Sequence, residues 1–206
     1  PYCRACDHGP TSVVAPHRVF IEVNWQIPFG RNQQYGASIN PVLNQLLGGW
    51  QVTMSYRAHT GQYFTPTYSG ADPANVNVFS GRPDVVGNPV LPAGQRSPDH
   101  WYNEAAFAIP AANSGRFGNL GRNTLQGPGF QFMDFGLFKT FPVHERARLL
   151  FSMVALNFLN HPNWSGIGNG INSANPGFIS GVTGPPSTYA FAGYMRGINL
   201  NAGIEF

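Results

Sequence analysis

The sequence predicts an all-β fold, a segment of an antiparallel transmembrane β-barrel, and three observations support this prediction. Apolar residues alternate with small or polar ones over stretches of about ten residues, the length that a tilted strand needs to cross a bilayer. Charged residues form only 10% of the 206-residue chain, well below the globular average of about a quarter. The links between the alternating stretches are short and long in turn, as in outer-membrane barrels.

The first three predicted strands cover residues 17–28, 49–64 and 130–142. Each has the period of two that places alternate side chains on opposite faces of a sheet. In the first strand, one face carries Val19, Ile21, Val23, Trp25 and Ile27, and the single apolar residue on the other face is Phe20. In the second, alternation runs without exception from Trp50 to His59, and in the third Met133, Phe135 and Leu137 oppose Asp134 and Gly136.

The fourth predicted strand, residues 147–159, is largely apolar on both faces between 149 and 156. We therefore expect its inner face to pack against a plug, a loop or another chain rather than against water.

The fifth predicted strand, residues 193–206, alternates most regularly and ends on an aromatic residue. In water such an unpaired edge invites aggregation, whereas in a barrel another strand covers it. We expect a carboxyl-terminal signal for barrel assembly here, formed by Tyr194, Ile198, Leu200, Ile204 and Phe206.

The four links alternate between shorter and longer ones, as they do in an outer-membrane barrel. If the last residue lies in the periplasm, the links 29–48 and 142–146 are periplasmic, and the longer links 65–129 and 160–192 are external. The aromatic and turn residues of 65–129 favour a packed lid. Its candidate ligand contacts are Arg82, Asp84, His100, Trp101 and Tyr102. The link 160–192 is rich in Asn and Gly and is interpreted as an exposed connector.

Alternation alone leaves a soluble β-sandwich open, and that alternative predicts that Val52, Met54 and Tyr56 face a protein core. Polar residues expected to face the lumen, with pairing across strands, are Arg18, Glu22, Arg57 and Asp134. An interfacial aromatic girdle, with core packing as the alternative, is predicted from Trp25, Trp50, Tyr56, Phe141 and Phe206.

Bulk composition excludes several classes of protein. No run of eighteen apolar residues occurs, so no transmembrane helix is predicted. The amino terminus lacks the basic start and apolar core of a signal peptide, so we expect an amino-terminal portion to precede these residues. The formal charge of +3 comes from scattered residues, which gives no basis for nucleic-acid binding.

Residue types that often form catalytic or metal sites have structural interpretations in this sequence. Cys3 and Cys6 predict a disulfide in an oxidising envelope, with half of a metal site beside His8 as the alternative. The histidines lack metal-site spacing, and His161 is expected to be a turn residue. Ser97, Asp99 and His100 are too close in sequence for a relay, and the glycines between 118 and 129 fit no phosphate loop. We expect no enzymatic activity, no metal and no cofactor.

A series of short motifs runs along nearly the whole chain. They are Pro16-His-Arg18, Ile27-Pro-Phe-Gly30, Gly48-Gly-Trp-Gln51, Thr60-Gly61 with Phe64, Gly81-Arg-Pro83, Trp101-Tyr-Asn103, Phe117-Gly-Asn119, Gly121-Arg-Asn123, Gly127-Pro-Gly129, Asp134, Lys139 and Asn157-Phe-Leu-Asn-His-Pro162. In this order they resemble the carboxyl-terminal end of a TonB-dependent outer-membrane receptor of the Oar-like branch, whose amino-terminal part resembles a carboxypeptidase regulatory domain.

The resemblance implies a barrel of about twenty-two strands filled by an amino-terminal plug, with uptake energised through TonB. The chain departs from the family in lacking the plug and most of the strands, and in carrying Ser152 and Val154 where relatives tend to have a charged pair.

The expected function is therefore part of a receptor-transporter of the bacterial outer membrane, which supplies barrel wall and external ligand-binding loops for a large solute. The alternative is a structural or interaction protein of the surface without transport. Expected partners are outer-membrane lipid, the remaining barrel strands and plug, the TonB system through the missing amino-terminal part, and the barrel-assembly machinery.

Overall fold

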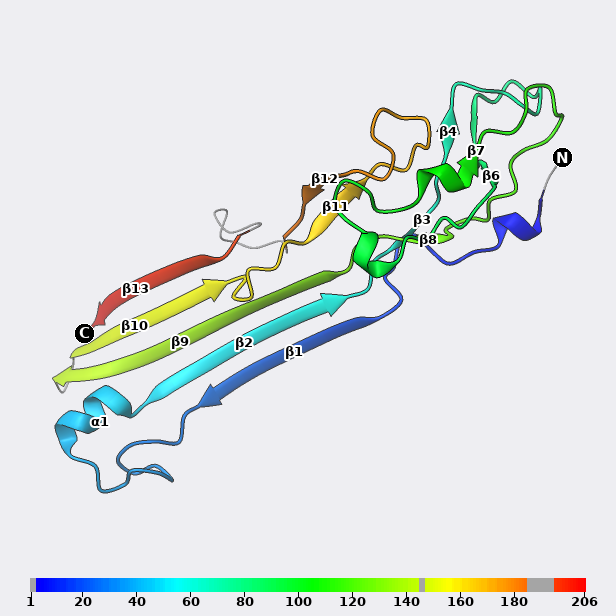
Figure 1. Ribbon diagram of the computed structural model, residues 1–206. Coiled ribbons are helices and arrows are strands. Elements are labelled where there is room, and N and C mark those ends of the chain that lie inside the picture. The colour runs from blue at the N-terminus through cyan, green and yellow to red at the C-terminus, as the bar shows by residue number, and fades with distance from the viewer. Residues whose placement is uncertain (1–2, 145–146, 185–194) are drawn as a thin grey trace. The chain divides into compact units, whose positions relative to one another are not determined.

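The structure is a computed structural model that describes residues 3–144, 147–184 and 195–206 (Figure 1). The chain divides into two compact units. The sheet unit comprises residues 19–58, 131–162 and 184–206, and the loop unit comprises residues 1–18, 59–130 and 163–183.

The sheet unit is built from five long strands that lie side by side in the order β1-β2-β9-β10-β13 (Figure 1). Their bounds are β1 Arg18–Gln26, β2 Trp50–His59, β9 Phe130–His144, β10 Ala147–Leu156 and β13 Gly197–Glu205. The long strands lie in the sheet in the same order in which they follow one another along the chain. Within the described residues the strands form an open antiparallel sheet and no closed barrel.

The register aligns the apolar faces of three strands. Met153 pairs with Leu137 on one side and with Leu200 on the other, whereas its neighbour Ser152 pairs with Phe138 and Asn201. Side chains of paired residues share a face of the sheet. The outer face, as we name it, therefore carries Phe135, Leu137, Lys139, Phe141, Leu149, Phe151, Met153, Ala155, Ile198, Leu200, Ala202 and Ile204.

Strand β2 also places its apolar residues on the outer face. A Cβ built on Gly136 would overlap Thr53 Oγ1, so Thr53 lies on the opposite, inner face. The Trp50 ring contacts the Phe151 ring at 6.2 Å on the outer face. Val52, Met54 and Tyr56 alternate with Thr53 and therefore share the outer face with Trp50.

Apart from Lys139 and Ala155, which are buried, the residues of the outer face stay partly or largely exposed among the described residues. Leu200 is 67% exposed, Ile198 60% and Ile204 64%. A soluble sandwich would bury these side chains against a second sheet, at a gain of about 1.5–3 kcal/mol each. The exposed apolar face therefore contradicts the sandwich alternative and favours a fold that lipid solvates.

The predicted strand limits need correction at several ends. The strand predicted over 49–64 ends at His59, because at Gly61 two backbones meet so closely that a Cβ would overlap the Gly127 carbonyl oxygen. The strand predicted to reach 159 ends at Leu156, since Asn157 has a positive φ of 47° and starts a turn. The third strand runs two residues beyond 142, to His144.

Part of the predicted limits lies outside the described residues, namely 145–146 of the predicted turn and 193–194 of the last strand, with Tyr194. Residues 185–192 of the predicted external link also lie there.

The link 29–48 contains a helix, α1 Pro41–Leu47, that the sequence analysis did not predict. Asn40 caps it, since its Oδ1 accepts a hydrogen bond of 2.9 Å from Val42 N, and Pro41 occupies the first helical turn. Asparagine followed by proline is a recognised start signal, but seven residues are too few for the periodicity to show. No helix among the described residues is long and apolar enough to cross a membrane.

Within its described residues, the loop unit holds four two-stranded sheets. Most of their strands are labelled in Figure 1. They are β3 Tyr63–Phe64 with β8 Leu125–Gln126, β4 Tyr68–Ser69 with β5 Ser80–Gly81, β6 Asp84–Val85 with β7 Phe107–Ala108, and β11 Trp164–Ile167 with β12 Ile179–Val182. The 3₁₀ helices of this unit are Ala5–Asp7, Ala93–Gln95 and Glu104–Ala106.

A small core holds the loop unit together. Its buried members are Tyr102, Phe107, Leu120 and Leu125. Ile167 and Ile171 of the link 160–192 pack against this core, so that link is not a plain exposed connector. Sequence reasoning missed this because the apolar residues are few and widely spaced between Asn and Gly, and their contacts come from another part of the chain.

Candidate functional site

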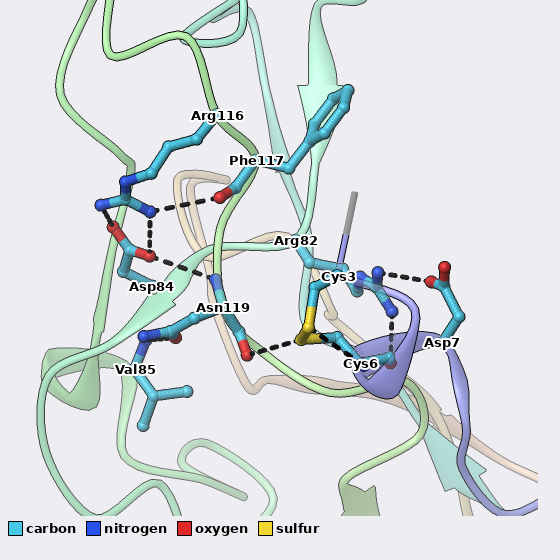
Figure 2. The surroundings of a disulfide bond; sticks show 9 residues. All are labelled: Cys3, Cys6, Asp7, Arg82, Asp84, Val85, Arg116, Phe117 and Asn119. Atoms are coloured by element: carbon cyan, nitrogen blue, oxygen red, sulfur yellow. Dashed lines mark hydrogen bonds and ion pairs between the residues drawn. A yellow bond between two sulfur atoms is a disulfide. The ribbon is translucent and has the colours of Figure 1, made fainter. Parts of the chain in front are cut away.

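The amino-terminal end of the loop unit is held by a disulfide and an arginine (Figure 2). Cys3 and Cys6 are bonded, with their Cα atoms 5.1 Å apart. Arg82 donates a hydrogen bond of 2.7 Å to the Cys6 carbonyl and pairs with Asp7 at 2.6 Å. The Arg122 backbone N–H also donates to the Cys6 carbonyl, at 2.8 Å. The Arg82 guanidinium therefore braces the segment 3–7.

A second arginine pair organises the segment around Asp84 (Figure 2). Arg116 binds the Asp84 carboxylate through both terminal nitrogens, at 2.8 and 2.7 Å. The Asn119 backbone N–H donates to the same carboxylate at 3.1 Å. These bonds to the charged form, with Arg116 first, hold the pKa of Asp84 below its usual range despite the opposing effect of burial.

Two of the predicted ligand contacts are packing residues. Tyr102 is 1% exposed and its hydroxyl donates to the Gly168 carbonyl at 3.0 Å. Burial raises the pKa of Tyr102 to about 12. Trp101 donates its indole N–H to the Gln126 carbonyl at 2.8 Å. Tyr102 therefore joins the link 65–129 to the link 160–192, whereas the bond of Trp101 holds two parts of the link 65–129 together.

The five predicted contacts do not converge on one place. Arg82 and Asp84 are engaged by Asp7 and Arg116, and Trp101 and Tyr102 by backbone carbonyls. His100 is exposed, with its Nδ1 3.9 Å from Glu104 Oε1. Ligand contact by these residues stays a prediction.

The loop unit contains a groove of about 510 Å³ elsewhere. Three segments line it: 59–64, 127–130 and 164–169, together with Thr183. The volume lies within the range of about 300–1,000 Å³ that small-molecule sites occupy. The ring-bearing residues of the lining are His59, Tyr63, Phe64, Phe130 and Trp164, and its amide and hydroxyl residues are Gln62, Ser165, Asn169 and Thr183.

Aromatic packing fixes the rings of the groove. The His59 ring stacks on the Phe130 ring at a centroid distance of 5.0 Å and an interplanar angle of 6°. Trp164 meets Trp101 edge to face at 6.1 Å, and Phe64 contacts the core residue Tyr102 at 5.9 Å. Preorganised rings lose little conformational entropy when a ligand binds.

The chemistry of the groove is uncharged. Among the described residues that line it there is no Asp, Glu, Lys or Arg. Flat aromatic faces beside amides, hydroxyls and backbone carbonyls suit a neutral ligand that has both apolar faces and hydrogen-bonding groups. The sequence alone does not reveal this set of residues, because their segments are far apart along the chain.

Asn123 is a buried polar residue that the sequence placed only in a motif. It is 4% exposed and has a positive φ of 53°. Its backbone N–H donates to Thr65 Oγ1 at 2.7 Å, and its side-chain amide donates to the Pro10 carbonyl at 2.6 Å. It ties three segments of the loop unit together.

Polar groups of the inner face of the sheet make local contacts. The Arg57 guanidinium lies over the Phe20 ring at 5.3 Å, which gives the one apolar exception of β1 a cation–π contact. Asp134 accepts a hydrogen bond of 3.1 Å from the backbone N–H of Asn157. Arg18 and Glu22 are exposed, and pairing by these two stays a prediction. Within the described part of the chain no cluster of three potential metal ligands occurs.

A comparison with protein-family models decides the class of the sheet. Residues 1–196 match the outer membrane beta barrel domain. The chain belongs to this family of outer membrane β-barrel domains. No curated protein and no solved structure matched the chain. The β-barrel domain therefore resides in the bacterial outer membrane. In such barrels lipid meets the apolar outward side of the wall, so we expect the apolar outer face to be that side.

Of the five residues predicted to form an aromatic girdle, four lie at one end of the sheet. Trp25 lies near the end of β1, and the Trp50 carbonyl accepts from Ile27 N at 2.9 Å. Phe141 lies near the end of β9, and Phe206 directly follows β13, whose last residue, Glu205, pairs with Arg148. Tyr56 lies six residues further along β2, about 20 Å away at the rise of a strand.

Proposed function

We propose that this β-barrel domain is the carboxyl-terminal part of a TonB-dependent receptor that imports a large, uncharged solute. The groove of the loop unit is the observation that supports this proposal most. It has the size of a ligand site, rings fixed by packing, and a described lining without charged side chains. The motif series that resembles TonB-dependent receptors supports the mode of transport.

A neutral oligosaccharide fits this groove better than an anionic chelate. Sugar rings present apolar C–H faces to aromatic side chains and hydroxyls to amides and carbonyls, whereas an anion would need cationic donors. A neutral peptide has some of these features, and the experiment below separates the two. In this proposal the domain performs no catalysis and needs no cofactor or metal.

The remaining partners follow from the same proposal. Further strands and a plug complete the barrel, since known barrels have at least about eight strands. The plug contacts TonB, and the barrel-assembly machinery recognises the last strand, with Ile198, Leu200 and Ile204 on its outer face and Phe206 directly after it.

The proposal is tested by uptake into cells that produce the full-length protein, with fluorescently labelled neutral oligosaccharides, neutral peptides and an anionic ferric chelate as probes. We expect uptake of the oligosaccharides that stops when a protonophore collapses the inner-membrane potential. Absence of uptake for all probes would favour the non-transporting scaffold, and uptake unaffected by the protonophore would exclude energised transport.

Replacement of Trp164 by Ala tests the groove. We expect binding of the oligosaccharide to weaken about two- to twelvefold, because one aromatic contact contributes about 0.5–1.5 kcal/mol. Replacement of Tyr35, an exposed aromatic residue of the sheet unit, is the matched control and should leave binding unchanged. Equal affinity of W164A and the parent protein would remove the groove from the proposal.

A further inference from the structure

Helix α1 has its apolar and polar sides reversed relative to a helix of a water-soluble protein. Its exposed residues include Val42 at 70%, Leu43 at 48%, Leu46 at 59% and Leu47 at 50%. Val42 and Leu46 are four residues apart, as are Leu43 and Leu47, so the four side chains form a single stripe on the helix. The helix carries no charged residue.

The polar residues of α1 face the protein instead. Asn44 Oδ1 accepts a hydrogen bond of 2.7 Å from the backbone N–H of Arg31. Gln45 donates from Nε2 to the Pro142 carbonyl of β9 at 3.3 Å. Both polar side chains of α1 therefore bond to the sheet unit, although Gln45 is also exposed, and the exposed apolar side chains lie together on the rest of the helix.

Lys139 fastens the carboxyl end of this helix to the sheet. It is 4% exposed although it lies in the outer-face row of β9. Its ammonium donates to the Leu46 carbonyl at 3.2 Å and also to the Gly48 carbonyl. The Trp50 indole N–H donates to the same Leu46 carbonyl at 2.9 Å. A cation at the carboxyl end of a helix satisfies its free carbonyls and its dipole.

Two aromatic rings complete the surroundings of Lys139. Its ammonium lies 4.9 Å from the centroid of the Trp50 ring and 4.9 Å from that of the Phe141 ring. A lysine in the row that meets lipid would be costly at the bilayer centre, so its position at the end of β9 among aromatic rings marks the edge of the hydrocarbon layer.

The apolar stripe of α1 is continuous with an established interface. The outer face meets lipid, and Lys139, Trp50 and Phe141 join α1 to that face. This end of the sheet carries the short connection between β9 and β10, which in outer-membrane barrels faces the periplasm.

We propose that α1 is an interfacial helix that lies on the periplasmic leaflet, with its four apolar side chains among the acyl chains of phospholipids and with Lys139 as its anchor on the barrel wall. The helix fixes the depth at which this part of the wall sits in the bilayer. The proposal rests on the outer-membrane location and is independent of the receptor function.

The test attaches a fluorophore at one of two positions within the link 29–48. The full-length protein is refolded into phosphatidylethanolamine and phosphatidylglycerol vesicles, and an environment-sensitive dye is attached to L43C or, as the matched control, to Q33C at an exposed polar position. Cys3 and Cys6 do not react with the dye, because they are bonded to each other, and any cysteine of the full-length protein outside these 206 residues is first replaced by serine.

For L43C we expect a blue-shifted emission that brominated acyl chains quench and aqueous iodide does not. For Q33C we expect the opposite pattern. Iodide quenching of L43C would show that the stripe lies in water, and protection from both quenchers would show that a protein or a second copy covers it. Either result overturns the proposal.

Two substitutions at Lys139 test the anchor in the L43C background. Lys139→Met removes the donors to Leu46 and Gly48, so we expect loss of quenching by brominated lipid, whereas Lys139→Arg keeps a cation and should retain it. Unchanged quenching in K139M would refute the anchoring role. If K139M fails to assemble, the comparison of L43C with Q33C still decides whether the helix meets lipid.

Discussion

At the scale of single residues, the polar side chains that stand out in the sequence hold the loop unit together. Arg82 joins two segments through the Asp7 carboxylate and the Cys6 carbonyl, and Arg116 joins two segments through the Asp84 carboxylate. The backbones of the motifs Gly81-Arg-Pro83 and Phe117-Gly-Asn119 approach each other closely, since a Cβ on Gly118 would overlap the Arg82 carbonyl oxygen. Motifs far apart in the chain are thus parts of one contact.

The lowered pKa of Asp84 predicts that the stability of the loop unit depends on pH. Because its folded-state pKa is lowered, its contribution to stability is present above the unfolded value of about 3.9 and is lost as the pH falls through the folded value. We expect the urea midpoint of the loop unit in the full-length protein, followed by tryptophan fluorescence in detergent, to fall with pH in this acidic window.

Asp84→Asn should lower the midpoint at neutral pH and flatten this acidic slope, because the amide cannot ionise. Asp99→Asn, at an exposed carboxylate of the same unit, is the control and should keep the parent slope. A slope that is the same in D84N and in the parent protein would contradict the assignment.

At the scale of elements, the strand register decides which side chains meet lipid. Leu200 and Asn201 are adjacent in β13 but pair with Met153 and Ser152, which lie on opposite faces. A single-residue slip would exchange the two faces along the whole strand.

Arginine substitutions at these two positions should therefore differ in effect. Leu200→Arg places a charge on the lipid face and should destabilise the barrel by about 2–4 kcal/mol if it lies near the midplane. Asn201→Arg places the same charge on the inner face and should assemble nearly as the parent does. The folded fraction on cold sodium dodecyl sulfate gels measures both, and equal losses would contradict the assigned faces.

At the scale of the whole molecule, the five strands form an open sheet with an apolar side that needs lipid and two edge strands, β1 and β13, that need partners. Known barrels begin at about eight strands, so closure requires strands beyond these five.

Closure is measured by heat-modifiable gel mobility. We expect the full-length protein in detergent to migrate faster before boiling than after it, because a closed barrel resists unfolding by the detergent. The 206-residue segment alone should show no such shift and should aggregate without detergent. A monodisperse segment in plain buffer would mean that its apolar face is covered, and would overturn the membrane fold.

The sequence by itself determined the five strands and their membrane setting, because low charge and apolar stretches of about ten residues are local properties. Alternation also indicated the faces of the long strands other than 147–159, which is apolar on both sides and whose faces the strand register decides. The sequence also pointed to the Cys3–Cys6 disulfide, which the structure contains. Strand ends such as His59 escaped it, since the limit is set by contact of Gly61 with Gly127, sixty-six positions away by their numbers.

Only the tertiary structure decided the groove and the setting of α1. The groove combines His59, Phe130 and Trp164 from three distant segments, and the buried state of Lys139 depends on carbonyls at the end of a seven-residue helix. Such sites depend on which chain segments meet in space, and a periodic pattern within one segment carries no information about that.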